Sequence, residues 1–163
     1  MGTTFVRIGE HGFWMSDSVL ELWLRFLALH VEDPIDSGSP ATTIRDQWLL
    51  ASRGYFTGCV PDGLEEAVST REGDRLVRSA IGSLMESLKS APPCLPRGVL
   101  NLMGFGGSDL GVDVETWRLV EVGYAFLDLL DGKITTGPSD PTLMPGSGDR
   151  RLTEPGTTTG NET

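Results

Sequence analysis

An almost uninterrupted apolar stretch runs from residue 19 to residue 31 and predicts the central helix of the protein. Ser18 and Glu21 have the spacing of a capping box, which satisfies unpaired amides at the start of a helix. One thin stripe at helical spacing is expected to face solvent, and it consists of Glu21, Arg25, Ala28 and Glu32. Because the rest of the helix surface is apolar, we expect other elements to surround this helix.

Weaker helical patterns follow along the chain. We expect helices over residues 43–53 and 71–89, a short helix from Pro61 to Val68, and a last helix that Asp113 caps and that ends at Asp131. Gly82 interrupts the helix over 71–89, and we interpret it as a point of close packing against a neighbour.

These patterns define a mainly α fold, a compact bundle of about four to six helices. Residues 3–8 are β-prone and add an optional short N-terminal strand, whereas residues 97–103 fit either a short helix or a buried strand. We expect one globular domain over residues 1–132. Residues 133–163 are rich in Gly, Pro, Thr and Ser, and this composition predicts a disordered tail.

The charge balance narrows the classes of partner. The chain has 23 Asp and Glu against 13 Lys and Arg, which gives a net charge of −10. A surface of this sign repels nucleic acid and anionic membranes, and it favours a basic protein partner. No apolar run has the length of a membrane span, the N-terminus lacks a signal-peptide pattern, and only two cysteines occur. We therefore expect a cytoplasmic protein, with no nucleic-acid or membrane partner.

Residues that could carry chemistry are few. Gly104 and Gly106 begin a glycine-rich loop before a helix, but Asp109 stands where a phosphate-binding loop needs its third glycine. No spacing of His, Cys, Asp or Glu matches a metal site, and His11 and His30 have no nucleophile at a recognisable spacing. We therefore expect no cofactor, no metal and no catalytic residue, and an enzyme is the less favoured class.

The favoured hypothesis is a non-catalytic, acidic protein-binding module. An immunity-type protein of bacteria, which neutralises a basic partner, is one concrete form of it. Aromatic residues are enriched at the centres of protein interfaces, and acidic groups around them would steer a basic partner. The residues expected to bind the partner are Trp14, Asp33, Asp36, Glu65 and Glu66. Trp14 has a competing interpretation, in which it only covers the start of the central helix.

Two alternatives stay open at this stage. One is a small hydrolase-type enzyme with an unrecognised site around His11, Arg45 and Asp46. The other is a helical accessory domain that forms homo-oligomers through surplus apolar helix faces. The two main classes differ in the expected shape of the site. An enclosed cavity with His11 and several carboxylates would favour the enzyme, and Trp14 exposed beside acidic groups would favour the binding module.

Overall fold

A computed structural model describes residues 2–32, 38–104 and 109–148. Within these ranges the fold combines helices with two small antiparallel sheets. The elements in chain order are β1 (Thr3–Ile8), β2 (His11–Ser16), α1 (Asp17–His30), α2 (Pro40–Ala51), α3 (Leu64–Ala67), α4 (Arg71–Lys89), β3 (Cys94–Leu95), α5 (Arg97–Leu102), β4 (Val114–Glu115) and α6 (Thr116–Leu130). The expected helices are present, but the fold is a mixed α/β fold because the sheets complete it.

The N-terminal sheet is a hairpin of two strands, where the sequence suggested one. Phe5 pairs with Trp14 and Val6 with Phe13 across the two strands. The turn is two residues long, and Gly9 occupies its first position with a φ of 60°, which glycine adopts without strain. Val6 and Phe13 are fully buried, whereas Phe5 and Trp14 lie on the opposite face of the hairpin.

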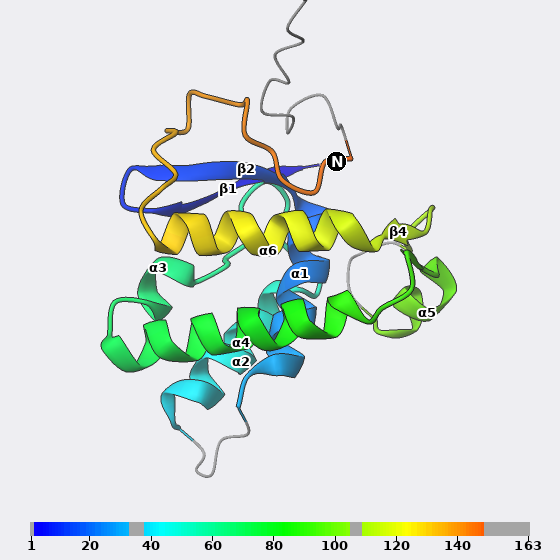
Figure 1. Cartoon of the computed structure of the whole chain (residues 1–163), viewed down its shortest axis with the longest axis horizontal. Coiled ribbons are helices and arrows are strands. Elements are labelled where there is room, and N and C mark those ends of the chain that lie inside the picture. Colours follow the sequence, from blue (N-terminus) through cyan, green and yellow to red (C-terminus); the bar gives the residue numbers. More distant parts are fainter. Residues whose placement is uncertain (1, 33–37, 105–108, 149–163) are drawn as a thin grey trace, which may run out of the picture.

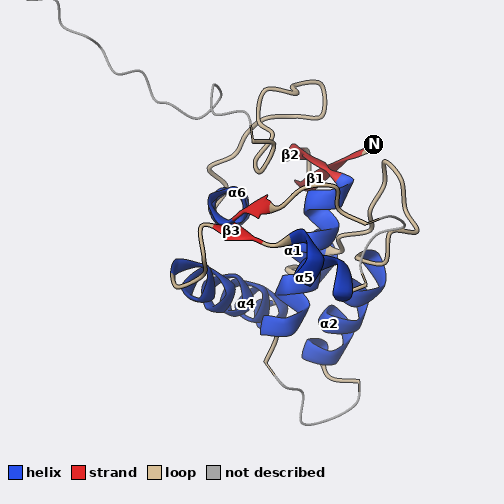
Figure 2. Cartoon of the chain, turned by 90° about the vertical axis from the view of Figure 1, so that its right-hand side faces the viewer, coloured by secondary structure: helices blue, strands red, loops and turns tan. Residues whose placement is uncertain are grey.

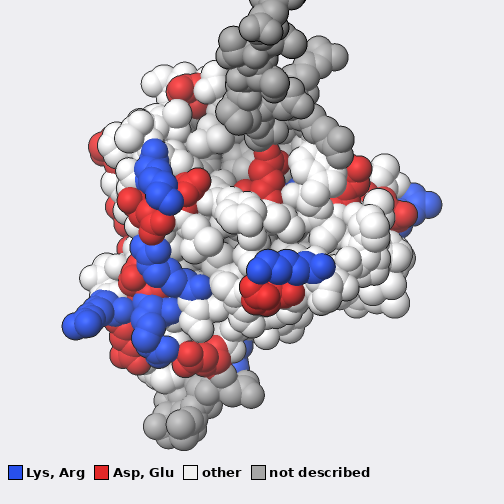
Figure 3. All heavy atoms as spheres, viewed as in Figure 1, with Lys and Arg blue, Asp and Glu red and all other residues white. Residues whose placement is uncertain are grey.

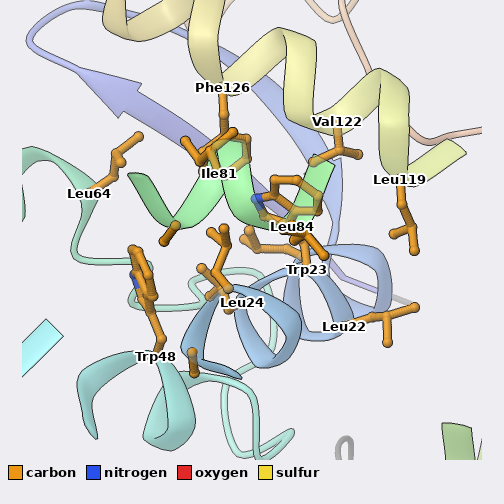
Figure 4. Close-up of a cluster of buried hydrophobic side chains, with 14 of the residues drawn as sticks. Leu22, Trp23, Leu24, Trp48, Leu64, Ile81, Leu84, Leu119, Val122 and Phe126 are labelled. Carbon is orange, nitrogen blue, oxygen red and sulfur yellow. The ribbon is translucent and has the colours of Figure 1, made fainter. Parts of the chain in front are cut away.

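Helix α1 passes behind α6 and α4 and crosses both of them (Figure 1). It packs against α2 and α4, and β2 leads directly into it. The indole of Trp23 lies at the centre of the core, with its ring centroid 5.6 Å from that of Phe126. Phe13 from the hairpin also reaches Phe126, at 5.6 Å (Figure 4 shows the buried cluster around Trp23 and Phe126). The apolar run in the sequence thus does form the central helix.

The solvent-facing stripe expected on the central helix is wrong at Glu21 and Ala28, whereas Arg25 is half-buried and Glu32 is exposed. Glu21 and Ala28 are only 6% and 3% exposed, and no ion pair joins Glu21 to Arg25 among the described residues. Leu29 is instead 64% exposed. The reason is that α2, α4 and the hairpin surround the helix on several sides, and helical spacing alone does not say which side they leave open.

Several predicted helix starts also move. Helix α1 begins after Ser16 and not at the expected capping box. Helix α2 begins at Pro40, because the hydroxyl of Ser39 accepts from the amide of Thr42 and caps the helix three residues earlier than predicted. Asp113 does not cap α6, since its carboxylate accepts from the backbone amide of Arg97 at 2.9 Å.

The structure decides two further points, the secondary structure of residues 97–102 and the packing at Gly82. Residues 97–102 are helical, as α5, which Figure 2 shows in front of α1. Gly82 is exposed, and a Cβ built there meets nothing within 4 Å, so the expectation of close packing at Gly82 is wrong. Close packing occurs at Gly123 of α6 instead, where a Cβ would collide with Met85 and lie 3.1 Å from Trp23.

Residues 133–148, named the strap here, pack along the free edge of β2. The backbone amide of Gly12 donates to Thr136 at 2.9 Å, and that of Trp14 donates to Leu143 at 3.2 Å. At the far end, the carbonyl of Gly146 accepts from Arg118 Nε at 2.7 Å. The prediction of disorder from residue 133 onward is therefore wrong for the strap. Residues 149–163 lie outside the described part.

The strap escapes a composition-based prediction for a physical reason. The strap contributes few apolar side chains and has no core of its own. Backbone hydrogen bonds to an edge strand fix it instead. Thr136 adds a side-chain hydrogen bond to the carbonyl of Gly12, at 2.6 Å. The globular unit consequently extends to at least residue 148.

Candidate functional site

A pocket of about 270 Å³ lies where the hairpin meets α3, and it is named the hairpin pocket here. Phe5 and Arg7 line it from β1, and Asp62, Glu65 and Glu66 line it from the start and body of α3. It brings together one aromatic ring, one cation and three carboxylates. Two of the partner-binding residues expected from the sequence, Glu65 and Glu66, thus line the same pocket as the aromatic ring of Phe5.

Helix α3 is positioned by the turn that precedes it. The indole nitrogen of Trp48 donates to the carbonyl of Asp62 at 2.9 Å, which ties this turn to the buried face of α2. Gly63 then takes a φ of 62°, and the carboxylate of Asp62 accepts from the amide of Leu64 at 2.9 Å. These contacts fix the direction in which Glu65 and Glu66 leave the first turn of α3.

The three carboxylates of the hairpin pocket differ in environment. Glu65 accepts from the backbone amide of Gly9 at 2.8 Å and so joins α3 to the hairpin turn. Glu66 is exposed and has no ion pair within the described residues. Burial raises the pKa of Asp62, and the charge of Glu65 adds to the rise, while the Leu64 amide and Arg7 oppose it. A cation in the pocket would lower that pKa again.

Arg7 is the one cationic side chain that lines the hairpin pocket. It is exposed, and no ion pair fixes it among the described residues. The pocket therefore holds three acidic groups against one base, and its net negative charge is not neutralised from within.

The aromatic wall of the pocket is the ring of Phe5, and a second ring packs against it. The ring of Trp14 lies 5.3 Å from the ring of Phe5, centroid to centroid, on the outer face of the hairpin. The indole nitrogen of Trp14 donates to the carbonyl of Pro138 at 3.0 Å. Trp14 is therefore half-buried under the strap, and it supports Phe5, which is the ring that lines the pocket.

Two of the acidic residues expected to bind the partner cannot be placed beside the hairpin pocket or away from it. Asp33 and Asp36 lie outside the described residues. The neighbouring Glu32 forms an ion pair with Arg75 of α4, with the two charged groups 3.0 Å apart. Trp14, Glu65 and Glu66 are therefore the predicted site residues that the structure brings to one region.

Six acidic side chains elsewhere form ion pairs with bases among the described residues. On the face formed by α4 and α6, Arg78 contacts Asp74 and Asp131 at 3.0 and 2.7 Å, and Lys89 contacts Glu86 at 2.6 Å. Figure 3 shows this face, where blue and red side chains alternate. Those charges neutralise each other locally, whereas Asp62, Glu65 and Glu66 form no ion pair within the described residues.

The residues considered for an enzyme have separate contacts in the structure. His11 contacts the carbonyl of Thr135 in the strap at 3.0 Å, and Arg45 and Asp46 form their own ion pair at 3.5 Å. His30 Nδ1 lies 2.8 Å from the hydroxyl of Ser83 on the exposed surface between α1 and α4. Burial lowers the pKa of His30, and no carboxylate orients its ring among the described residues. Ser108 lies outside those residues.

Sequence reasoning missed a buried acidic pair on α1. Asp17 is 8% exposed, and its carboxylate accepts from Thr4 at 2.8 Å and from the amide of Gly58 at 2.7 Å. Burial, together with the charge of Asp17, raises the pKa of Glu21 to about 7. The four-residue spacing between the two acids was visible in the sequence, but the same spacing describes a wet helix face.

Neither family models, curated proteins nor solved structures yield a match to this chain. In the described part, no set of His, Cys, Asp and Glu side chains is arranged to hold a metal ion. The described helices also lack the combined length and hydropathy of a membrane span.

Proposed function

We propose that the protein is a non-catalytic, acidic protein-binding module, and that the hairpin pocket receives a lysine or arginine side chain of a basic partner. The observation that carries this proposal is the juxtaposition of Phe5 with Asp62, Glu65 and Glu66 in one pocket. A cation placed there would lie beside the ring of Phe5 and near three carboxylates. A cation–π contact contributes about 0.5–1 kcal/mol at an exposed site.

The distribution of charge supports a role of the pocket acids in binding a partner over a role in stabilising the fold. Glu66 has no ion pair within the described residues, whereas four acids of the α4 and α6 face, Asp74, Glu86, Asp128 and Asp131, each have one. The net charge of −10 would accelerate the approach of a basic partner at low salt, and the pocket would set the position of one of its side chains. A pocket of this size anchors a larger contact surface and does not supply all of the affinity.

The finer form of the proposal is an immunity-type protein that blocks a basic toxin in the cytoplasm. Two features support it. Cys59 and Cys94 are exposed free thiols, which a reducing compartment tolerates. The contacts of His11 and His30 also fit structural roles, since each ring joins two distant segments of the chain through one oxygen, of Thr135 and of Ser83 respectively.

A titration with defined peptides tests the proposal. Hexalysine and hexaarginine are added to the full chain, hexaglutamate serves as the peptide control, and backbone amide shifts are followed by NMR. We expect shifts at Phe5, Gly9 and Glu65 with the basic peptides. Affinity should fall by about tenfold or more between about 0.05 and 0.5 M salt, because exposed charges are screened over that range.

A charge-matched pair of variants locates the site. Glu65→Gln with Glu66→Gln removes two charges from the pocket, and the new side-chain amide oxygen at position 65 can still accept from Gly9. Glu86→Gln with Asp128→Asn removes two charges from the α4 and α6 face. We expect the first pair to weaken peptide binding by roughly five- to tenfold and the second by less than about twofold. Equal losses, or amide shifts that map away from the hairpin, would refute the pocket as the binding site.

A further inference from the structure

A second cavity, of about 420 Å³, lies between the first turns of α1 and α6, the 109–114 loop and the strap. It is named the α1–α6 pocket here. Its apolar lining consists of Val19, Leu22, Leu110, Val112, Val114 and Met144. The volume falls within the range of about 300–1,000 Å³ in which small-molecule pockets occur. The cavity therefore has the size and lining of a ligand site.

The loop wall of this pocket is fixed from α5. The side chain of Asn101 donates to the carbonyl of Leu110 at 3.3 Å and accepts from its amide at 2.8 Å. Arg97 contacts the carbonyl of Gly111 through its guanidinium and the carboxylate of Asp113 through its backbone amide. Four hydrogen bonds thus hold a short loop in one conformation.

The strap wall is fixed at Gly146. Its carbonyl accepts from Arg118 Nε at 2.7 Å, and its amide donates to Glu121 at 2.9 Å. A Cβ at this position would lie 2.8 Å from Val122 and 3.0 Å from Val19, so the strap backbone packs directly on the two helices. Both walls are held by bonds that need no ligand, and the pocket is pre-formed.

The apolar lining extends from the core to the surface. Leu22 is 1% exposed and forms the inner end, whereas Val112 is 68% exposed at the rim. An apolar ligand body that covered Val112 would remove this side chain from water. Burying such surface is favourable by about 25 cal/mol per Å².

Hydrogen-bond donors collect at another side of the pocket. Ser16, Ser18 and Arg118 line it, and the two hydroxyls and the terminal guanidinium nitrogens of these residues have no hydrogen-bond partner within the described residues. Asp17 engages Thr4 and Gly58 on the other side of α1 and does not compete for them. Such a set of donors around one cation suits a carboxylate.

We propose that the α1–α6 pocket binds a small carboxylic acid with an apolar body. The carboxylate lies against Arg118 and the two serines, and the body lies along Leu22 toward Val112. Asp109 lines the pocket from its exposed edge, where its charge would repel an anion, and this keeps the carboxylate at the Arg118 end. This site is separate from the hairpin pocket and does not depend on the proposed binding of a basic partner.

Titration of the full chain with octanoate tests this site. Octylamine has the same apolar body with a cationic head group, and acetate has the same head group without the body. Amide shifts are followed by NMR. We expect octanoate to shift Ser18, Val19 and Val112 with a dissociation constant on the order of 0.1–1 mM, and the other two probes to bind at least about tenfold more weakly. Octylamine binding as well as octanoate would overturn the assignment of the charged end.

Two exposed valines provide a matched pair of variants. Val112→Asp places a charge at the rim of the pocket, and Val99→Asp places the same charge on α5 outside the lining, where the side chain is 59% exposed. Neither side chain belongs to the core, so both variants should fold. We expect Val112→Asp to weaken octanoate binding by about tenfold or more and Val99→Asp to leave it within about twofold. No octanoate shifts at millimolar concentration, or equal binding by the two variants, would overturn the proposal.

Discussion

The indole nitrogen of Trp14 donates to the carbonyl of Pro138 at 3.0 Å, across 124 positions of the sequence. This bond places the strap over the outer face of the hairpin, where the ring of Trp14 also packs at a tilt against Phe5. The residue that sequence reasoning selected as a partner anchor therefore has a structural role as well. It holds the aromatic wall of the hairpin pocket in position.

Trp14→Phe is expected to loosen the strap. Phenylalanine keeps a ring beside Phe5 but cannot donate to Pro138, and the loss of one such bond reduces the free energy of unfolding by about 1 kcal/mol. Hydrogen exchange at the amide of Gly12, which donates to Thr136, should become faster. Thr136→Val removes another contact of the strap and should have the same effect. Unchanged protection of Gly12 in both variants would show that the strap does not cover the edge of β2.

Glu21→Gln is expected to change how stability depends on pH. Burial and the charge of Asp17 raise the pKa of Glu21 from 4.5 to about 7 in the fold. The folded state therefore prefers protonated Glu21, and ionisation destabilises it progressively as pH rises from about 4.5 to about 7, by up to roughly 3 kcal/mol.

The comparison is made by chemical denaturation of wild type and variant at several pH values. Near pH 4.5 the two proteins should have similar free energies of unfolding, and above pH 7 the Gln variant should be the more stable, because it carries no charge to bury. Glu72→Gln on the exposed side of α4 is the control. Parallel pH profiles for wild type and Glu21→Gln would contradict the buried position of this carboxylate.

Asp17 and Thr4 form a coupled network with the loop after α2. Thr4 donates to Asp17 at 2.8 Å and accepts from the amide of Val60 at 2.9 Å, while Gly58 donates to Asp17 at 2.7 Å. Asp17→Ala leaves these donors unpaired in a buried site, and we expect a loss of roughly 2–4 kcal/mol.

Thr4→Val should reduce stability by about 1–2 kcal/mol, since the shape is kept and the hydroxyl is lost. In a double-mutant cycle measured by thermal unfolding, the combined variant should lose less than the sum of the single variants, because the two residues share one bond. Additive losses would mean that the two side chains act independently.

Gly82 and Gly123 should respond in opposite directions to alanine. Gly82 lies in α4 with open space around its Cβ position, so Gly82→Ala should stabilise the protein by about 1 kcal/mol through helix propensity. Gly123 packs against Met85 and Trp23, so Gly123→Ala should destabilise it by about 1–3 kcal/mol through overpacking. Both midpoints are measured by urea unfolding. A stabilising Gly123→Ala would show that the contact between α4 and α6 is looser than described.

The amino-acid sequence by itself determined the local elements. The apolar run at residues 19–31 forms the central helix, and the amphipathic spacing over 71–89 matches α4 at both ends. The net charge is likewise a property of the sequence. These features succeed because helical period and charge are encoded within a few neighbouring residues.

The tertiary structure decided everything that depends on partners far away in the chain. The second strand of the hairpin, the ordered strap, the burial of Glu21 and the meeting of Phe5 with Glu65 all follow from contacts between distant segments. Backbone hydrogen bonds to an edge strand leave no trace in composition, and helical spacing marks a face without saying what covers it. The two pockets exist for the same reason, since each is enclosed by segments that only folding brings together.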